Sequence, residues 1–438
     1  MASSKTLIKK SKSLASAKLA VAFSGGLDSA VLLHATVMAH GAQNVYAFHV
    51  HHGIQKQATK WQRHCRQVAA KLGCHFDTRN IQLSHSSNIE AQAREHRYQA
   101  LREMCQVHQI ENLLVAHHQD DQAETILIQL MRGSGLAGLS GMPPLKQAKS
   151  SQIYIWRPFL ELRKEELEAY AKENQLTWIE DPSNQDEAYR RNAIRKTLLP
   201  QLEEVQPGAI RNLARSARHM AEAQELLNHL ADIDLGLIES AKGLSKTNLL
   251  RLYKTNQPRA KNALRRWLSR QDLAYPSEER LTAWFVDLQQ VRKDAQLQWE
   301  HDGVLIRLWR EHLFVEKVRE PKQSKRTESN HPTGEWAFKK LPAKSKKVGI
   351  AADRFNEAKK KGLINTMERQ GGEKFKVQIN RPRKSLKNLY QEASIPPWQR
   401  DVPLLYIGDE LVAVAGIGIS ADWQSVEGPR IGLEWLSS

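Results

Sequence analysis

The sequence of 438 residues is too long for a single hydrophobic core and long enough for two or three domains. Its 65 Lys and Arg residues against 48 Asp and Glu give a formal net charge of +17, which favours a polyanionic partner, nucleic acid first. No apolar run approaches the roughly 20 residues of a membrane span. The three cysteines form no C-x-x-C pair, which argues against a disulfide scaffold and a Cys₄ metal site.

The first 18 residues are basic, rich in serine and free of acidic residues. They lead directly into the first expected strand, which leaves little room for the cleavage site of a transit peptide. We interpret them as a basic tail. Because no apolar signal segment follows, we expect a cytoplasmic protein.

The chain then runs through a strand, a glycine turn and a helix within a few residues. Residues 19–23 form a short apolar run typical of a buried parallel strand. The Ser-Gly-Gly of residues 24–26 follows at once, and Asp28 and Ser29 open an apolar helix over residues 30–34. Adjacent glycines let the backbone turn sharply and present N–H groups to an anion, and the helix N-terminus adds partial positive charge. This pattern predicts a phosphate site.

The predicted phosphate site is not the common nucleotide loop, because no G-x-x-x-x-G-K-[ST] occurs in the chain. Asp28 lies in it instead, and a carboxylate facing phosphates requires a bridging cation such as Mg²⁺. The alternative is a plain Gly-Gly turn with Asp28 and Ser29 as helix caps. The flanking strand and helix favour phosphate binding. The stretch resembles the pyrophosphate-binding loop of N-type ATP pyrophosphatases, which bind ATP, transfer AMP to a substrate oxygen and release pyrophosphate.

Strands and helices alternate through the first 200 residues. The expected strands cover residues 19–23, 44–50 and 113–116, with a further strand and its loop over residues 74–83. The further expected helices cover residues 55–72, 89–107, 123–131 and 164–173. This alternation predicts an α/β, Rossmann-like parallel sheet covered on both faces. Three polar stretches follow strands: residues 24–29, residues 51–53 (His-His-Gly) and residues 117–124. Since ligands bind at the carboxyl ends of such strands, we expect these stretches to share one site.

An acidic cluster is the second chemical feature. Asp121 and Glu124 lie three residues apart at a helix start, so their carboxylates share one face. Acids favoured by the helix dipole are the simple alternative. Opposite a phosphate loop, Asp120, Asp121 and Glu124 could hold Mg²⁺ or receive an ammonium group. His117 could donate to a phosphate or a leaving oxygen, although a structural histidine is equally compatible with its position.

The rest of the chain predicts three further regions after a catalytic domain over residues 1–200. Residues 201–318 form a mainly helical domain, in which residues 264–268 (Leu-Arg-Arg-Trp-Leu) either bind RNA or pack one face into a core, and residues 297–314 alternate like a short sheet. Residues 319–347 are a basic linker, and residues 348–438 form a small α+β domain with a hairpin over 403–416. The glycine-rich residues 133–141 are interpreted as a flexible loop.

A group of motifs in fixed order narrows the resemblance. The motifs are SGGLDS, HHG, AHHQDDQAET and RRNAIR, then RQGGE, KSLKNLYQEASIPPWQRDVPL and the closing hairpin. Together they resemble the tRNA(Ile)-lysidine synthetases over nearly all of the chain. Ala116 departs from this family, which usually has glycine before the two histidines, so the local turn there is open.

The resemblance implies a two-step reaction. ATP adenylates the C2 oxygen of the wobble cytidine in tRNA(Ile) with a CAU anticodon, and pyrophosphate leaves. The side-chain amine of free L-lysine then attacks C2 and AMP leaves, so that the modified base pairs with adenine instead of guanine. Adenylation makes physical sense because the carbonyl oxygen is a poor leaving group. An acidic pocket suits the lysine amine, which is mostly protonated at neutral pH.

The resemblance also implies site residues and partners. ATP would contact Ser24, Gly25, Gly26, Leu27, Asp28 and Ser29. The catalytic residues would be Asp28, Arg94, His117, Asp121, Glu124, Arg191 and Arg195, with Asp28 and Asp121 as Mg²⁺ ligands. Which arginine has which role stays open. The partners would be the tRNA, gripped by the second and third domains, and lysine, with no membrane. The sequence is compatible with a homodimer but does not give the oligomeric state.

Three other interpretations remain. A tRNA thiolase of the same superfamily needs paired cysteines, and the three here are spread along the chain. A non-catalytic tRNA-binding protein would not need Asp28, Asp121 and Glu124. An amidotransferase-type synthetase would need a glutaminase domain, which we do not recognise.

Overall fold

The computed structural model describes residues 18–51, 58–81, 89–148, 151–180, 190–240, 243–292, 297–317, 334–342, 345, 347–393, 395–397, 400 and 402–437. The chain divides into two compact units, Met1–Val291 and Arg292–Ser438. The three-domain borders expected from the sequence stay a prediction. Among the helices of the described ranges, none combines the length and apolar character needed to cross a membrane.

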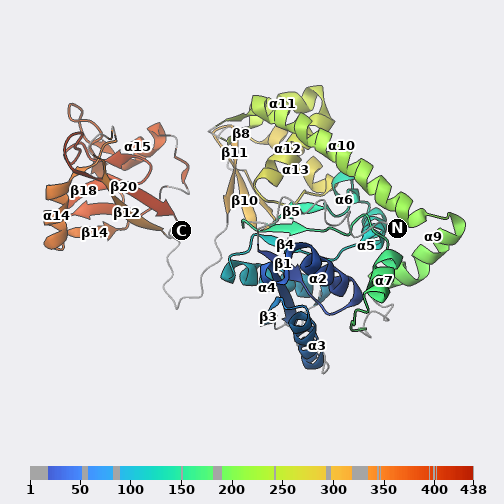
Figure 1. Ribbon diagram of the computed structural model, residues 1–438. Coiled ribbons are helices and arrows are strands. Elements are labelled where there is room, and N and C mark those ends of the chain that lie inside the picture. The colour runs from blue at the N-terminus through green and yellow to red at the C-terminus, as the bar shows by residue number, and fades with distance from the viewer. Residues whose placement is uncertain are drawn as a thin grey trace. The chain divides into compact units, whose positions relative to one another are not determined.

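A six-stranded sheet forms the centre of the first unit (Figure 1). Its strands are β1 (Leu19–Ala22), β2 (Val45–His51), β3 (His75–Asn80), β4 (Asn112–Leu114), β5 (Leu145–Gln147) and β6 (Tyr154–Trp156). The order is β3-β2-β1-β4-β6-β5, and every neighbouring pair is parallel except β5 with β6. The predicted parallel α/β sheet is confirmed. The antiparallel edge strand β5 was not predicted, because its three residues are all exposed and show no apolar pattern.

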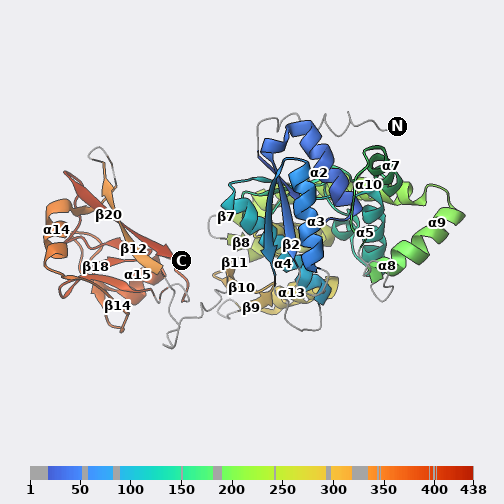
Figure 2. The ribbon, with the colours of Figure 1, turned by 60° about the horizontal axis from the view of Figure 1, so that its bottom comes forward.

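Helices cover both faces of this sheet (Figure 2). They are α2 (Leu27–His40), α3 (Ala58–Lys71), α4 (Ile89–Val107) and α7 (Lys164–Glu173), with a 3-10 turn η2 (Ala42–Asn44). The apolar face of α5 (Gln119–Met131) packs instead against Ile194, Leu199 and Ile210. Alternate β1 residues set the two faces: Leu19 and Val21 pack with α2, α3 and α7, whereas Ala20 packs with α4. The predicted helices are therefore confirmed, although α5 begins four residues before the expected 123–131. Its first turn thus contains Asp120 and Asp121.

The remaining part of the first unit is mainly helical, as expected. It contains α6 (Leu136–Leu139), α8 (Arg190–Ala193), a π-helical turn η4 (Ile194–Leu198), α9 (Leu199–Val205), α10 (Ala209–Ile238), α11 (Lys246–Thr255), α12 (Gln257–Arg270), α13 (Glu278–Gln290) and the strand pair β7 (Glu239–Ser240) and β8 (Gly243–Ser245). The glycine-rich residues 133–141 are not simply a flexible loop, because α6 lies within them.

The segment at residues 264–268 belongs to the core of this helical part. Its two leucines and its tryptophan are buried on one face of α12. Its two arginines are ion-paired: Arg265 Nη2 lies 2.6 Å from Glu278, and Arg266 Nε lies 2.8 Å from Asp232. These contacts favour the core interpretation over RNA binding.

The second unit consists of small antiparallel sheets and two helices. Its elements are β9 (Gln298–His301), β10 (Val304–Trp309), β11 (His312–Lys317), β12 (Gly334–Leu341), β13 (Ile350–Ala351), α14 (Ala352–Lys360), β14 (Ile364–Met367), β15 (Lys374–Phe375), β16 (Lys384–Ser385), α15 (Leu386–Glu392), β17 (Leu404–Ile407), β18 (Glu410–Val414), β19 (Gly418–Ile419) and β20 (Arg430–Ser437). Antiparallel pairing of β9, β10 and β11 confirms the short sheet expected over residues 297–314, and β17 with β18 confirms the predicted hairpin.

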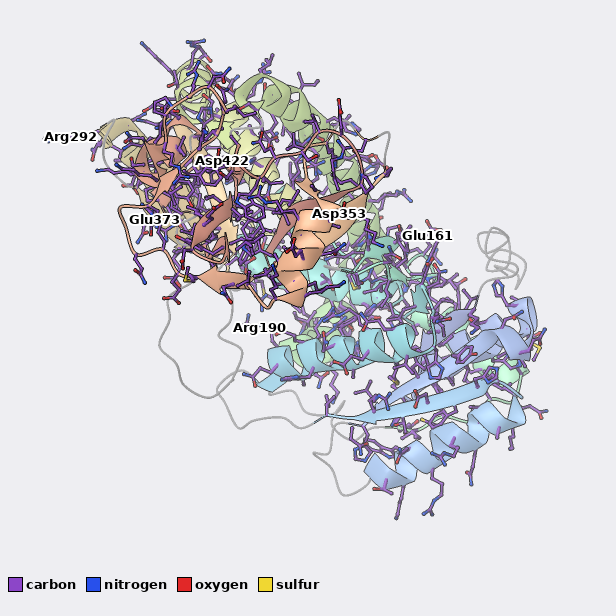
Figure 3. All side chains as sticks on the ribbon, turned by 90° about the vertical axis from the view of Figure 1, so that its left-hand side faces the viewer. Glu161, Arg190, Arg292, Asp353, Glu373 and Asp422 are labelled. Atoms are coloured by element: carbon purple, nitrogen blue, oxygen red, sulfur yellow. The ribbon has the colours of Figure 1, made fainter. Side chains whose placement is uncertain are left out.

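Part of the expected linker is ordered in this unit. β12 pairs with β20 along eight residues, so residues 334–341 are a strand and not a linker. Two of the lysines that suggested a linker, Lys339 and Lys340, are adjacent in β12 and follow its apolar residues Trp336 to Phe338. Basic side chains elsewhere in the unit lie against carboxylates: Lys376 Nζ is 2.8 Å from Asp422, and Arg369 Nε is 3.7 Å from Glu373. Figure 3 labels the two acidic residues, Asp422 and Glu373.

Because Trp267 is 3% exposed, we expect Trp267→Ala to lower the free energy of unfolding by about 3–5 kcal/mol. Denaturant unfolding of the purified protein measures this. Leu226→Ala, at a position that is 70% exposed on α10, is the control and should change the value by less than about 0.5 kcal/mol. A Trp267→Ala protein of normal stability with weakened RNA binding would contradict the core assignment.

Candidate active site

The glycine loop between β1 and α2 packs closely against Cys65 and Ile179. Gly25 has φ +90°, and a Cβ there would lie 2.8 Å from Cys65 Sγ and 2.9 Å from Ile179 Cδ1. The Gly25 carbonyl accepts a 2.8 Å hydrogen bond from Ile179 N–H. Gly26, in contrast, has φ −75°, and its Cβ would meet only ordinary contacts. Only the first glycine is therefore required by the turn, which corrects the expectation that both serve it.

The two serines of the loop bind each other and the backbone. Their hydroxyl oxygens are 3.0 Å apart, and the Ser29 hydroxyl also donates to the Gly26 carbonyl at 2.9 Å. Leu27 begins α2 and packs against the core on the face of the sheet that α2, α3 and α7 cover. The N-terminus of α2 therefore opens at the carboxyl end of β1, as the phosphate-site prediction requires.

The loop after β4 brings the second motif to the same place. β1 pairs in parallel with β4, so the chain leaves both strands at the same edge. His118, which is 2% exposed, lies between the two motifs. Its Nε2 is 3.7 Å from Asp28 Oδ2 and 3.5 Å from Asp121 Oδ2. The glycine loop and the acidic cluster thus lie side by side, which is the arrangement that the sequence predicted.

Two arginines neutralise the acidic pair. Arg191 Nε lies 2.6 Å from Glu124 Oε2, and its Nη2 lies 3.0 Å from Asp121 Oδ1. Arg195 Nε lies 2.6 Å from Glu124 Oε1, and its Nη2 lies 3.3 Å from Asp121 Oδ1. Arg195 belongs to the π-helical turn η4, and such turns recur at functional sites. Because Glu124 is fully buried, both of its oxygens need these partners.

Burial and charge move the pKa values of the central groups. Burial raises the pKa of Asp28, against the opposing charges of His118 and Lys164. For His118, burial acts to lower the pKa, but Asp120, whose Oδ2 lies 3.5 Å from Nδ1, and the charges of Asp121 and Asp28 raise it above the ordinary value. An imidazolium at His118 is therefore favoured beside these carboxylates.

His117 lies in a different environment from its neighbour. Burial lowers its pKa well below the ordinary range, and the charges of Arg157, Arg191 and Arg94 act in the same direction. Its Nδ1 is buried without a hydrogen-bond partner in the described part of the chain. Arg94, the remaining predicted catalytic residue, is exposed on α4. The structure thus brings six of the seven predicted catalytic residues into one cluster, with Arg94 at its edge.

Sequence reasoning missed the roles of His118 and Asp120. Asp120 Oδ2 accepts a 3.0 Å hydrogen bond from Lys164 N–H and lies 3.3 Å from Arg163 Nε. Although burial opposes it, the nearby His118 and the hydrogen bond from Lys164 N–H hold the pKa of Asp120 at about 2. Asp120 therefore ties the start of α7 to the site. The only sequence signal was its place in the HHQDD motif, which does not say which way each side chain points.

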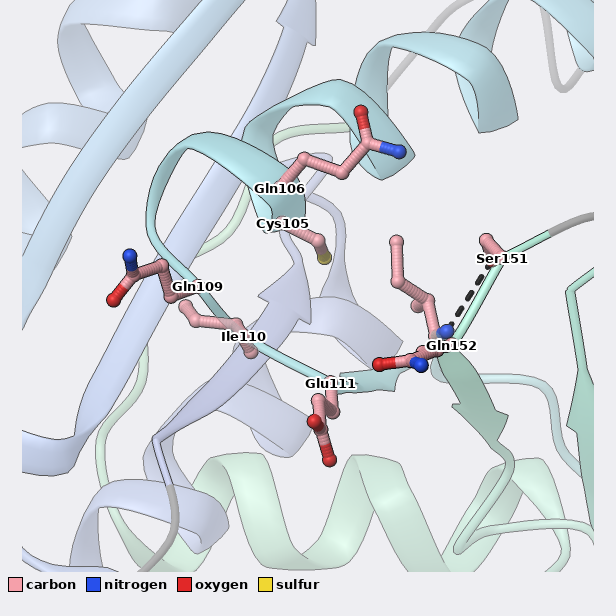
Figure 4. A pocket seen from close by; sticks show the side chains of 8 residues that line it. Cys105, Gln106, Gln109, Ile110, Glu111, Ser151 and Gln152 are labelled. Carbon is pink, nitrogen blue, oxygen red and sulfur yellow. Dashed lines mark hydrogen bonds between the residues drawn. The ribbon is translucent and has the colours of Figure 1, made fainter. Parts of the chain in front are cut away.

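The His-His-Gly stretch lies partly outside the described residues, and a cavity lies away from the candidate site. His51 ends β2, but His52 and Gly53 lie outside the described residues. A cavity of about 330 Å³ opens where β4 and β6 begin, lined by Cys105, Ile110 and Ile153 among others (Figure 4). It lies at the amino ends of these strands, so it is separate from the site at their carboxyl ends.

Comparison with known proteins agrees with this geometry. Residues 2–202 match the PP-loop domain, residues 248–314 the TilS substrate binding domain, and residues 364–435 the TilS substrate C-terminal domain. The tRNA(Ile)-lysidine synthase of Burkholderia pseudomallei is 36% identical over 92% of this chain and 89% of its own. That of Ralstonia nicotianae is 36% identical over 96% and 94%. Among solved structures, the U34-tRNA thiolase NcsA of Methanococcus maripaludis covers 50% of this chain and 78% of its own, at 19% identity and a TM-score of 0.44, too weak to bear on function.

The parallel sheet, the glycine loop at the end of β1 and the matched domain define a PP-loop ATP-binding protein. The identity to the curated relatives extends over nearly the whole chain. The chain therefore belongs to the tRNA(Ile)-lysidine synthase family, and the resemblance found in its motifs is confirmed.

The close contact under the glycine loop predicts different effects at its two glycines. We expect Gly25→Ala to lower the free energy of unfolding by about 1–3 kcal/mol. The added methyl group would clash with Cys65 Sγ, and the positive φ is unfavourable for alanine. Gly26→Ala is the matched control, with a loss below about 1 kcal/mol at this helix N-cap. Denaturant unfolding compares the two, and equal losses would rule out the proposed cause.

The raised pKa of His118 predicts a pH-dependent contribution to stability. Because the folded-state pKa lies above the ordinary value, this contribution is full below the unfolded-state pKa of about 6.5 and is lost as pH rises through the folded-state pKa. The loss of unfolding free energy in His118→Gln should therefore shrink from low to high pH. The exposed His229→Gln on α10 serves as control. A loss in His118→Gln that grows with pH would contradict the assignment.

Proposed function

We propose that this chain joins L-lysine to C2 of the wobble cytidine in tRNA(Ile) with a CAU anticodon, through an adenylated intermediate. It would thus be a ligase that forms a carbon–nitrogen bond, releases pyrophosphate and AMP, and changes codon reading from AUG to AUA. The names of the curated relatives support the substrates. The observation that carries the proposal is the 3.7 Å approach of Asp28 on the glycine loop to His118, beside Asp121 and Glu124.

The glycine loop would seat the phosphates of ATP. The loop leads directly into the N-terminus of α2, whose partial positive charge and free N–H groups favour an anion. The hydroxyls of Ser24 and Ser29 could exchange their mutual hydrogen bond for phosphate oxygens. Gly25 would keep the backbone close enough for this contact.

The carboxyl of Asp28 fits a bound Mg²⁺. Its Oδ1 is buried and has no hydrogen-bond partner within the described ranges, and burial raises its pKa. Mg²⁺ is usually held by one or two carboxylates together with substrate phosphates. Asp28 would supply one ligand, and Asp121 would supply another once an arginine releases its Oδ1. Bound there, Mg²⁺ would neutralise charge on phosphates that face Asp28.

His117, Arg191 and Arg195 would act on the charge that develops during adenylation. The lowered pKa of His117 keeps its imidazole neutral, so that it can donate one hydrogen bond without adding charge. The two guanidinium groups remain charged, because their carboxylate partners outweigh burial and raise their pKa values. They are suited to stabilise the phosphate as pyrophosphate leaves and AMP leaves.

Lysine and the two arginines would compete for the same carboxylates. Asp121 and Glu124 carry two negative charges, which Arg191 and Arg195 balance. An incoming ammonium group can bind here only if an arginine turns away, for example towards the adenylate phosphate. Adenylation would thereby prepare the lysine site, and the carboxylate that receives the ammonium would help to remove its proton.

The cysteines favour this proposal over sulfur transfer. Cys65, Cys74 and Cys105 are free and buried, and burial raises their thiol pKa values to about 12, 11 and 12. Such thiols are poor nucleophiles and poor sulfur carriers.

The direct test is incorporation of labelled lysine into tRNA(Ile) transcripts in the presence of ATP. We expect incorporation with a wobble cytidine and none when that base is replaced by uridine. Incorporation that ignores the wobble base, or sulfur transfer in its place, would overturn the proposal.

Substitution of the facing carboxyls tests the site. We expect Asp28→Asn and Glu124→Gln each to lower lysine incorporation by at least about a hundredfold, with tRNA binding nearly unchanged. Glu168→Gln, at a half-buried position on α7, is the matched control. Because Glu124 is buried between two arginines, thermal unfolding of that variant must be measured as well. Turnover at the wild-type rate in both site variants would mean that the assignment is wrong.

A further inference from the structure

A group of basic side chains lies one strand beyond His117. Arg157 directly follows β6, which pairs in parallel with β4. Arg94 and Arg97 come from the first half of α4, and their guanidinium carbons lie 5.7 and 5.8 Å from the ring centroid of Tyr98. Tyr98 is also close enough to Arg157 to act on its pKa. We call Arg94, Arg97 and Arg157 the arginine cluster.

The arginine cluster carries positive charge that nearby carboxylates do not balance. In the described ranges, none of its three members forms an ion pair with an acidic residue. Arg157 is 7% exposed; its Nη1 donates to the Pro143 carbonyl at 2.8 Å, but its Nε is buried without a partner. The buried Nδ1 of His117 is likewise unpartnered. Burial lowers the pKa values of Arg97 and Arg157, and the neighbouring charge of Arg94 adds to this effect.

These features are those of an anion site and not of a structural pairing. A buried guanidinium is costly unless its charge is met. Here Asp121 and Glu124, the nearest acids of the active site, are already bonded to Arg191 and Arg195. A phosphate group would satisfy the fixed donors of several arginines at once.

The arginine cluster is separate from the glycine loop. The strand order β1-β4-β6 puts two strand spacings, about 10 Å, between the ends of β1 and β6. In addition, α4 covers one face of the sheet and α2 covers the other. The cluster and the glycine loop therefore lie on either side of the β4 loop that carries Asp121, and they would hold different phosphate groups.

We propose that Arg157, together with Arg94 and Arg97, binds a second phosphate group beyond the one at the glycine loop. The two sources of such a phosphate are the RNA backbone next to the modified nucleotide and the polyphosphate of ATP. Only the naming of these two sources rests on the proposed function, whereas the phosphate site itself does not.

The test measures binding of two probes to the full-length protein. One probe is an anticodon stem-loop RNA with a CAU loop, and the other is a non-hydrolysable ATP analogue. We expect Arg157→Met and Arg97→Met each to weaken binding of one probe by about tenfold or more. Arg102→Met, on the same helix but hydrogen-bonded to Gln99, is the matched control and should leave both affinities unchanged. Arg157→Lys, which keeps the charge without the paired N–H donors of the guanidinium group, should give an intermediate loss of affinity.

The outcome identifies the source of the phosphate. Weaker RNA binding with a salt dependence shallower by about 0.7–0.9 in log–log slope indicates a backbone phosphate. Weaker binding of the analogue alone indicates the polyphosphate. If Arg157→Met fails to fold, Arg97→Met, which loses no hydrogen bond given by the described structure, decides the question. Wild-type affinity for both probes in the folded variants would overturn the proposal. Neither probe needs lysine, so failure of lysine incorporation would count against the proposed function and not against this site.

Discussion

The parallel pairing of β1 with β4 is the constraint on which the rest of the site depends. It aligns Leu19 with Asn112 and Val21 with Leu114, so the segments that follow the two strands leave the sheet side by side. Neither motif alone defines a reaction, because a glycine turn and a pair of helix-start acids both have structural explanations. Held one strand spacing apart, they put an anion site beside carboxylates. The buried apolar residues of β1 fix this register, so the chemistry is positioned by the core of the domain.

Charge balance then divides the site into parts with different tasks. Asp121 and Glu124 are matched by Arg191 and Arg195, whereas one oxygen of Asp28 has no protein partner in the described structure and its pKa is raised by burial. The first group is suited to exchange partners during the reaction, and Asp28 is suited to a cation. Beyond β4, the arginine cluster has an excess of positive charge. The substrates that we propose, a nucleotide, an RNA and a cationic amino acid, match these three parts in charge.

Periodicity and motif order predicted the sheet, most helix bounds and the meeting of the two motifs, because these follow from local patterns and from the topology of parallel sheets. What failed depends on side-chain direction. The sequence could not tell that His118 and not His117 faces Asp28, since the direction of adjacent side chains is set by how β4 ends. Nor could it tell that Arg191 and Arg195 bind Glu124, because that contact joins residues 67 and 71 positions apart. The basic–aromatic residues 264–268 could serve two purposes, and only packing distinguished them.

The order of the two chemical steps is the most direct test of the account, because a shared site for ATP and RNA requires activation before lysine enters. The measurement is release of pyrophosphate from ATP in single turnover, with tRNA(Ile) present and lysine omitted. The account predicts release of pyrophosphate, up to one per active site, that depends on the wobble cytidine and leaves an adenylated tRNA which added lysine discharges. Release that requires lysine from the outset, or that proceeds equally without tRNA, would contradict it.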